Sequence, residues 1–135
     1  MSGNFEDAGK LLLRLLLGVL LLLHGLHKIV SGPGGVEGML VAHHVPGVLA
    51  YGVYLGEVLA PVLLILGVYS RLGGLLVVGN IAVAILVTHG IDIFHRNPYG
   101  GWAIELELFY GVCGLIVMLL GAGRYSVAGA KGKWN

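Results

Sequence analysis

Residues 11–30 read LLLRLLLGVLLLLHGLHKIV, and this stretch decides the fold class. It matches the length of about 20 apolar residues that an α-helix needs to cross the hydrocarbon core of a bilayer. A cleaved signal peptide would have a shorter apolar core followed by a small-residue cleavage site, whereas this run continues into His27 and Lys28. We therefore predict a retained transmembrane helix over residues 10–30.

The rest of the chain has the same apolar character. Of its 135 residues, 57% are hydrophobic and only 11% are charged, whereas about a quarter are charged in soluble domains. Three further apolar runs predict helices over residues 49–69, 75–91 and 102–120. We therefore expect residues 1–135 to form one domain, an all-α integral membrane four-helix bundle that crosses the cell membrane several times and contacts the lipid bilayer. The net charge of +1 gives no indication of nucleic-acid binding.

The connections between these runs contain glycine and proline. Residues 31–46 are rich in glycine but keep a roughly helical spacing of apolar residues, which predicts a short interfacial or re-entrant segment. Pro61 predicts a kink in the second helix, where neighbouring helices can satisfy the carbonyl that proline leaves free. Arg71, Gly73 and Gly74 predict a tight turn into the third helix.

The basic residues near the helix ends predict the orientation, because such residues accumulate on the cytoplasmic side. With four spans, one side carries Lys10, Arg14, Arg71, Arg124, Lys131 and Lys133, and the other side carries Lys28 and Arg96. We therefore predict that the N and C termini are both cytoplasmic. Arg14 is then expected to be an anchor that extends to the lipid headgroups.

Ionisable side chains are costly in hydrocarbon, so those within the spans are candidates for function. Five of them fall in the outer half of the predicted helices: His24, Lys28, Glu57, His89 and Glu105. His24 and Lys28 share one face of the first helix because they are four residues apart. Opposite Glu57 and Glu105 they would form a mixed-charge cluster, completed by His89 from the third helix. We predict that the five side chains line one polar pocket, which opens outward and is the catalytic or binding site.

Two other interpretations of this cluster stay open. The polar groups could be structural, holding the helices together while residues near the helix ends reach the headgroups. Histidine and carboxylate could also bind a metal ion, and the credible set is His24, Glu57, His89 and Glu105. Because no HxxxH or HExxH pair fixes two ligands on one helix face, we predict no metal site.

The order of these residues and their neighbours resembles the DoxX family of small membrane proteins over nearly the whole chain. The matching residues are Arg14, Leu16, Leu17, Gly18, His24, Gly25 and Lys28, then Glu57, Gly67 and Arg71, then residues 87–90, then Glu105, Leu106, Leu108 and Tyr110. Residues 121–126 are similar to the family's closing motif, with Ala122 in place of a proline. Val127 stands where the family has an acid, so no role of that acid is expected in this chain.

The resemblance implies a four-helix membrane protein of bacteria or archaea, similar to the membrane subunits of thiosulfate:quinone oxidoreductases. We therefore expect a quinone-interacting membrane subunit, with His24, Tyr54, Glu57 and His89 as candidate quinone contacts that supply hydrogen bonds and protons. The sequence carries no flavin, haem or iron–sulfur motif, so the chain would be at most one subunit of a quinone-dependent oxidoreductase. Its electrons would come from a soluble or membrane-attached oxidoreductase partner.

Two other functions stay open. A non-catalytic membrane scaffold or assembly factor for a redox or stress-response complex would use the cluster for packing and docking, and the chain could form a homo-oligomer. A pathway for protons or small solutes is the third hypothesis, although the sequence lacks the inverted repeats that are typical of transporters. Quinone carried by the purified protein would favour the first function over the other two.

Overall fold

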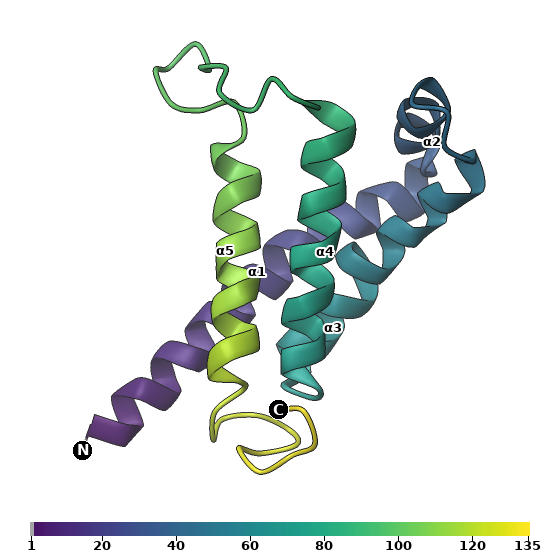
Figure 1. The fold of residues 1–135 in the computed structure, drawn as a ribbon. Helices are drawn as coiled ribbons and strands as arrows, with labels where there is room; N and C mark the ends of the chain where they lie inside the picture. Colours follow the sequence, from purple (N-terminus) through teal and green to yellow (C-terminus); the bar gives the residue numbers. More distant parts are fainter. Residues whose placement is uncertain (1) are drawn as a thin grey trace.

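The computed structural model describes residues 2–135, and most of these are helical (Figure 1). Helix α1 spans Ser2–Ser31 and the short helix α2 spans Gly34–Ala42. The second apolar run consists of a 3₁₀ segment η1 (Gly47–Gly52), a π-helical segment η2 (Leu55–Leu59) and helix α3 (Ala60–Leu66). Helices α4 and α5 span Ser70–Thr88 and Glu105–Leu120. The all-α prediction is confirmed. Helix α2 forms within residues 31–46, where the apolar spacing is roughly helical, and an interfacial or re-entrant position of this segment stays a prediction.

Three stretches of the chain are long and apolar enough to cross a membrane. They are Gly3–Ser31, Gly47–Leu66 and Ser70–Thr88. Helix α5 is also apolar, but its 16 residues span only about 24 Å, which is less than the ~30 Å of a hydrocarbon core. A fourth crossing, and with it the four-helix bundle, therefore stays a prediction.

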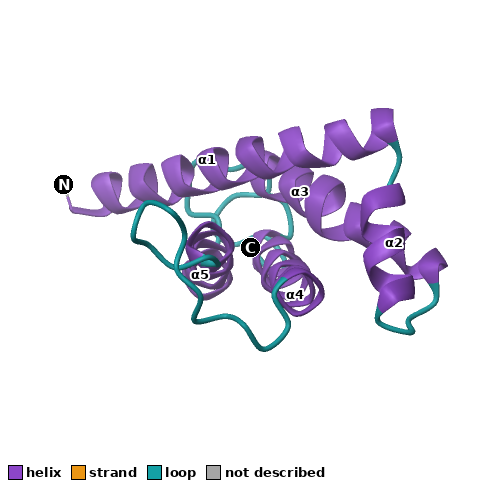
Figure 2. Cartoon of the chain, turned by 90° about the horizontal axis from the view of Figure 1, so that it is seen from above, coloured by secondary structure: helices purple, strands orange, loops and turns teal. Residues whose placement is uncertain are grey.

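Helices α4 and α5 lie side by side in opposite directions, and α1 crosses them obliquely together with α3 (Figure 1, Figure 2). Glycines let the backbones of α4 and α5 approach closely, since a Cβ at Gly114 would lie 3.0 Å from the carbonyl oxygen of Gly74. The buried core lies between the two layers and contains Leu17, Leu21, Ala60, Leu64, Val77, Ile81, Cys113 and Val117. Packing of small and aliphatic groups therefore holds the helices together at mid-height.

The second span is irregular around Pro61. Proline lacks the N–H that would bond to the carbonyl of Glu57 four residues earlier. In η2 the Ala60 N–H bonds to the Leu55 carbonyl, five residues back, which is the pattern of a single π-helical turn. The Glu57 carbonyl faces α1 at Gly25, where a Cβ atom would collide with it. The kink predicted from Pro61 thus takes the form of a π-helical turn that carries Glu57.

The turn between the second and third apolar runs lies earlier than predicted. Helix α3 ends before Gly67, which caps it with a left-handed φ of 70°. Helix α4 then begins at Ser70, so Gly73 and Gly74 are buried inside a helix. The predicted turn at Arg71, Gly73 and Gly74 is therefore wrong. The two glycines serve close helix packing, and the conformational freedom of glycine is needed at Gly67 instead.

Arg14 is fully buried at the end of the molecule where both ends of the chain lie (Figure 1). Its guanidinium donates hydrogen bonds to the carbonyl oxygens of Leu64 (2.6 Å), Tyr125 (2.6 Å) and Ala122 (3.1 Å). The prediction of a headgroup anchor is therefore wrong. These carbonyls lie at the end of α3 and just after α5, where backbone acceptors have no partner within a helix. Arg14 satisfies them inside the protein instead of extending to the headgroups.

Arg71 and the last residue of the chain act in a similar way at the same end. Arg71 Nη1 donates to the carbonyl oxygen of Met118, 3.0 Å away near the end of α5. The side-chain oxygen of Asn135 accepts a hydrogen bond from the Ser70 N–H, 3.2 Å away at the start of α4. We call this region, made of Arg14, Arg71 and residues 121–135, the arginine end.

Candidate functional site

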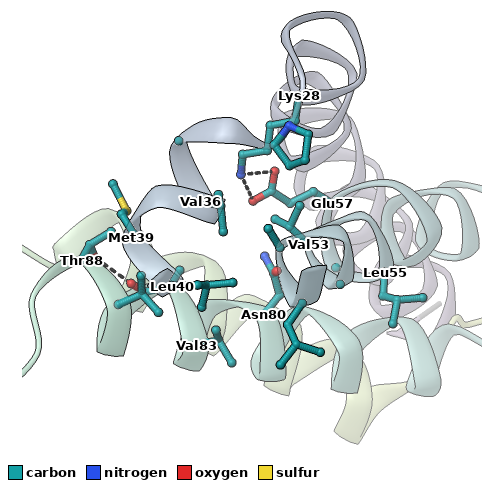
Figure 3. A pocket seen from close by; sticks show the side chains of 18 of the residues that line it. Lys28, Val36, Met39, Leu40, Val53, Leu55, Glu57, Asn80, Val83 and Thr88 are labelled. Atoms are coloured by element: carbon teal, nitrogen blue, oxygen red, sulfur yellow. Dashed lines mark hydrogen bonds and ion pairs between the residues drawn. The ribbon is translucent and has the colours of Figure 1, made fainter. Parts of the chain in front are cut away.

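The opposite end of the molecule contains a pocket of about 1040 Å³ (Figure 3). It lies between the last turn of α1, α2, η1, η2 and α4. Its walls are mainly aliphatic and include Val36, Met39, Leu40, Val53, Leu55 and Val83. Binding sites for small molecules are typically large, apolar cavities with a small number of polar groups. The pocket is therefore a candidate site for a hydrophobic small molecule.

One ion pair lies in the wall of this pocket. Lys28 Nζ is 2.6 Å from each carboxylate oxygen of Glu57 (Figure 3). The side chains of Lys28 and Glu57 are 25% and 10% exposed, so the pair is largely removed from solvent. A carboxylate in such a place needs a partner, because its lost hydration would otherwise be uncompensated. Since Lys28 binds both oxygens of Glu57, the pair as a whole presents no net charge.

Two neighbouring features position this pair. The π-helical turn of η2 carries Glu57 next to α1, and Gly25 of α1 leaves room for the backbone at that point. The Tyr54 hydroxyl donates a hydrogen bond to the backbone carbonyl of Lys28, 2.9 Å away. Tyr54 does not itself line the pocket. The geometry thus gives Tyr54 a role in holding the end of α1, while its predicted contact with a quinone stays a prediction.

His24 lies outside the pocket. Its Nδ1 is 2.9 Å from the carbonyl oxygen of Leu20, and its ring makes an edge contact with Tyr110 of α5 at a centroid distance of 6.2 Å. The prediction that His24 and Lys28 face one pocket is therefore wrong. Because α1 crosses the other helices obliquely, its successive turns face different neighbours (Figure 2). His24 contacts Tyr110 of α5, whereas Gly25 and Lys28 face Glu57 of η2.

His89 and Glu105 also lie outside the pocket. His89 Nε2 is 3.7 Å from Glu107 Oε1, which links the end of α4 to the first turn of α5. Glu105 Oε1 accepts a hydrogen bond from Asn97 Nδ2, 3.1 Å away in the loop before α5. Both residues therefore belong to the connection between α4 and α5. The prediction of one shared cavity is wrong for His24, His89 and Glu105, and any functional role of the three stays a prediction.

The geometry does not assemble a metal site from these residues. Within residues 2–135, no group of three or more histidine, cysteine, aspartate or glutamate side chains could hold a metal ion. The set considered as an alternative is dispersed, because Glu57 is paired with Lys28 while His24 and His89 contact α5. A metal site of His24, Glu57, His89 and Glu105 therefore has no geometric basis.

Asn80 is a pocket residue that is missing from the predicted set. It extends from α4 into the pocket, toward the side where Glu57 and Val53 lie (Figure 3). Its Cβ stands against Gly56, where an added Cβ would overlap it. Asn80 is the single amide in the apolar run of α4, and a polar side chain within a span is a functional signal of the same kind as an ionisable one. That signal could have found it from the sequence.

The comparisons with known proteins fit this arrangement. The sequence model of the DoxX family matches residues 9–90. The matched segment covers most of α1 and all of α2, η1, η2, α3 and α4, and every residue that lines the pocket lies within it. Neither a curated protein nor a solved structure matches the chain.

Proposed function

The chain belongs to the DoxX family of membrane proteins, and from this premise we propose that it is a quinone-interacting membrane subunit of an oxidoreductase system. The observation that carries the proposal is the pocket itself, a cavity of about 1040 Å³ whose mainly aliphatic walls contain one ion pair. A membrane quinone has the same division of properties, since a small polar ring is attached to a long apolar tail. The aliphatic walls suit the tail, and the polar corner suits the ring.

The ion pair can supply the chemistry that a quinone site needs. Reduction of a quinone to a quinol takes up two electrons and two protons, so the ring oxygens need hydrogen-bond donors and a route for protons. Lys28 can donate to a ring oxygen, and Glu57 can pass a proton to it. His27 and Ser31 line the pocket and are exposed, so they connect the pair to water. In this proposal His24 and His89 serve at most as more distant proton carriers.

The electrons must come from elsewhere in the system, because the sequence has no flavin, haem or iron–sulfur motif. We propose a soluble or membrane-attached oxidoreductase as the partner. It would dock at the pocket end, where the bound ring would be within reach of a donor cofactor. This chain would then hold the quinone and exchange protons, while the partner carries out the oxidation of the substrate.

We propose that α5 is the fourth crossing, in a cell-membrane bundle with both termini in the cytoplasm. Both ends of the described chain lie at the arginine end (Figure 1). Lys10, Arg71 and Arg124 contact residues of the same region, and basic residues favour the cytoplasmic side. Cysteine labelling in sealed cells tests this topology at the loop residue Asn97 and the tail residue Lys131. Labelling is expected at position 97 and not at 131, and the reverse pattern would contradict the orientation.

The quinone proposal is tested with Glu57→Gln, compared with Glu6→Gln as a matched control at an exposed position of the arginine end. We expect Glu57→Gln to lower the quinone that is recovered with the purified protein at least about tenfold, because a neutral amide no longer holds Lys28 Nζ in the position from which it would donate to a ring oxygen. Glu6→Gln should leave the quinone content unchanged. The thermal midpoint in detergent is measured in parallel. Unchanged quinone content with a large fall of the midpoint would favour the non-catalytic scaffold over the quinone subunit.

A further inference from the structure

Resting on the proposed function, we propose that the pocket accepts only amphiphiles whose polar head is uncharged, and that Asn80 binds this head. An apolar cavity alone would accept many lipids, because hydrophobic contact is not directional. Selection must therefore come from the few polar groups in the walls. Their charges and hydrogen bonds restrict the class of ligand.

The first argument concerns charge. Among the residues that the structure describes, one lysine, Lys28, and one carboxylate, Glu57, line the pocket. Lys28 Nζ is 2.6 Å from both carboxylate oxygens of Glu57. An anionic head that approached Lys28 would also approach the carboxylate of Glu57. A cationic head that approached Glu57 would meet Lys28. In a partly dehydrated pocket like charges repel strongly, so a neutral head is favoured over either ion.

The second argument concerns the hydrogen-bonding capacity of Asn80. Its side chain is half-buried and forms no hydrogen bond with any group of residues 2–135. Thr88 lines the same pocket, but its hydroxyl already donates to the Ala84 carbonyl 2.7 Å away. Polar groups in apolar surroundings normally have partners. The amide of Asn80 has two donor hydrogens and an acceptor oxygen, so it can bind a carbonyl or a hydroxyl head.

The third argument concerns the fixed position of this amide. A Cβ added at Gly56 would overlap the Cβ of Asn80 and lie 2.8 Å from its Oδ1. The contact thus involves the Cβ atom of Asn80, which is fixed by the backbone, as well as the amide oxygen at the end of the side chain. Gly56 precedes Glu57 in the π-helical turn of η2. The same turn therefore places the ion pair and the free amide at one corner of the pocket.

The test uses two probes with the same isoprenoid tail, farnesol with a neutral hydroxyl head and farnesoic acid with an anionic head. Binding to the full-length protein in detergent is measured at about pH 8.5, where the carboxyl head of farnesoic acid is ionised. The wild type should bind farnesol at least about tenfold more tightly than farnesoate. Equal affinities, tighter binding of farnesoate, or no binding of either probe would overturn the inference.

Three variants identify the groups responsible. Asn80→Leu should weaken the binding of farnesol about tenfold, because one hydrogen bond to the neutral head is lost. The affinity for farnesoate should stay unchanged. Asn4→Leu, the same substitution at an exposed position outside the pocket, is the matched control and should change neither affinity. Glu57→Gln leaves the charge of Lys28 uncompensated, so the preference should shift toward farnesoate by about tenfold or more. Helix content by circular dichroism confirms that each variant is folded. Unchanged farnesol affinity in folded Asn80→Leu would overturn the role of Asn80.

A third probe separates this inference from the quinone proposal. Decylubiquinone has a neutral head with carbonyl acceptors, so it should bind and should lose affinity in Asn80→Leu. If farnesol binds selectively and decylubiquinone does not, the quinone proposal fails while the selection of neutral heads stands. If decylubiquinone binds equally well to the wild type and to Asn80→Leu, the quinone proposal stands and the role of Asn80 is refuted.

Discussion

Arg14 and Lys28 are both basic residues of α1, but their charges have different kinds of partners at the two ends of the molecule. Arg14 is fully buried, and its hydrogen-bond partners are the backbone carbonyls of Leu64, Ala122 and Tyr125. Lys28 is paired with a single carboxylate in the wall of a large cavity. At the arginine end, polar side chains bind the backbone groups at the ends of helices. At the pocket end, they leave a cavity with unused hydrogen-bonding capacity.

From this contrast we expect the arginine end to carry stability and the pocket end to carry the proposed binding. Carbonyls at a helix end must find partners when water is excluded, and Arg14 provides them for α3 and for the segment after α5. At the pocket end, by contrast, Asn80 has no hydrogen-bond partner among residues 2–135. Variants at the two ends should therefore change different measurements, and three substitutions test this division.

The largest effect is expected from Arg14→Leu. It leaves three carbonyls without their donor, two of them buried and that of Tyr125 part-buried, and at about 1 kcal/mol for each the free energy of unfolding should fall by about 3 kcal/mol. Lys133→Leu is the matched control, since Lys133 is an exposed basic residue at the same end. The thermal midpoint in detergent and the quinone content per folded molecule are measured together. A stable Arg14→Leu protein would show that the arginine end does not carry the stability.

An intermediate effect is expected from Gly56→Ala. The added methyl group must displace Asn80, which should cost about 1–3 kcal/mol and also lower the quinone content. Gly52→Ala is the matched control from the same pocket wall, because a Cβ at Gly52 meets no atom within 4 Å. Both variants are compared by thermal midpoint and by quinone content. Equal behaviour of the two would refute the contact between Gly56 and Asn80 as the feature that positions the amide.

The smallest effect is expected from His89→Ala. The distance of 3.7 Å to Glu107 and the partial exposure of both side chains make this a weak pair, so the loss should stay below about 0.5 kcal/mol. Because His89 lies outside the pocket, the quinone content should not change. The same two measurements apply. A marked loss of quinone would restore His89 to the binding site and would extend the pocket end toward the connection between α4 and α5.

The helices were easier to predict from the sequence than the residues of the candidate site. The leucine-rich run alone predicts α1, because length and hydrophobicity are local properties. The turn at Gly67 was misplaced, since glycines that permit a turn and glycines that permit helix packing look alike in one sequence. Arg14 was misjudged as an anchor, because the carbonyls that it binds are contributed by residues far along the chain.

The part of the candidate site that could be predicted from the sequence is the single contact between Lys28 and Glu57. Lys28 and Glu57 carry opposite charges in neighbouring spans, so their approach could be expected. The separation of His24 from this pair depends on the oblique path of α1, which no local pattern contains (Figure 2). Asn80 is not ionisable, but a neutral amide within a span indicates function for the same physical reason as a charged group.

The hydrogen bonds of Arg14 also have a consequence for biosynthesis. Two of its acceptors, the carbonyls of Ala122 and Tyr125, are separated from it by 108 and 111 residues in the chain. At a synthesis rate of about 5–20 residues per second, roughly 5–20 s pass between translation of Arg14 and translation of these partners. During that time the guanidinium of the nascent first helix needs water or headgroups as a substitute. We therefore expect newly inserted α1 to hold Arg14 near a membrane surface and to bury it only after residues 122–125 have been synthesised.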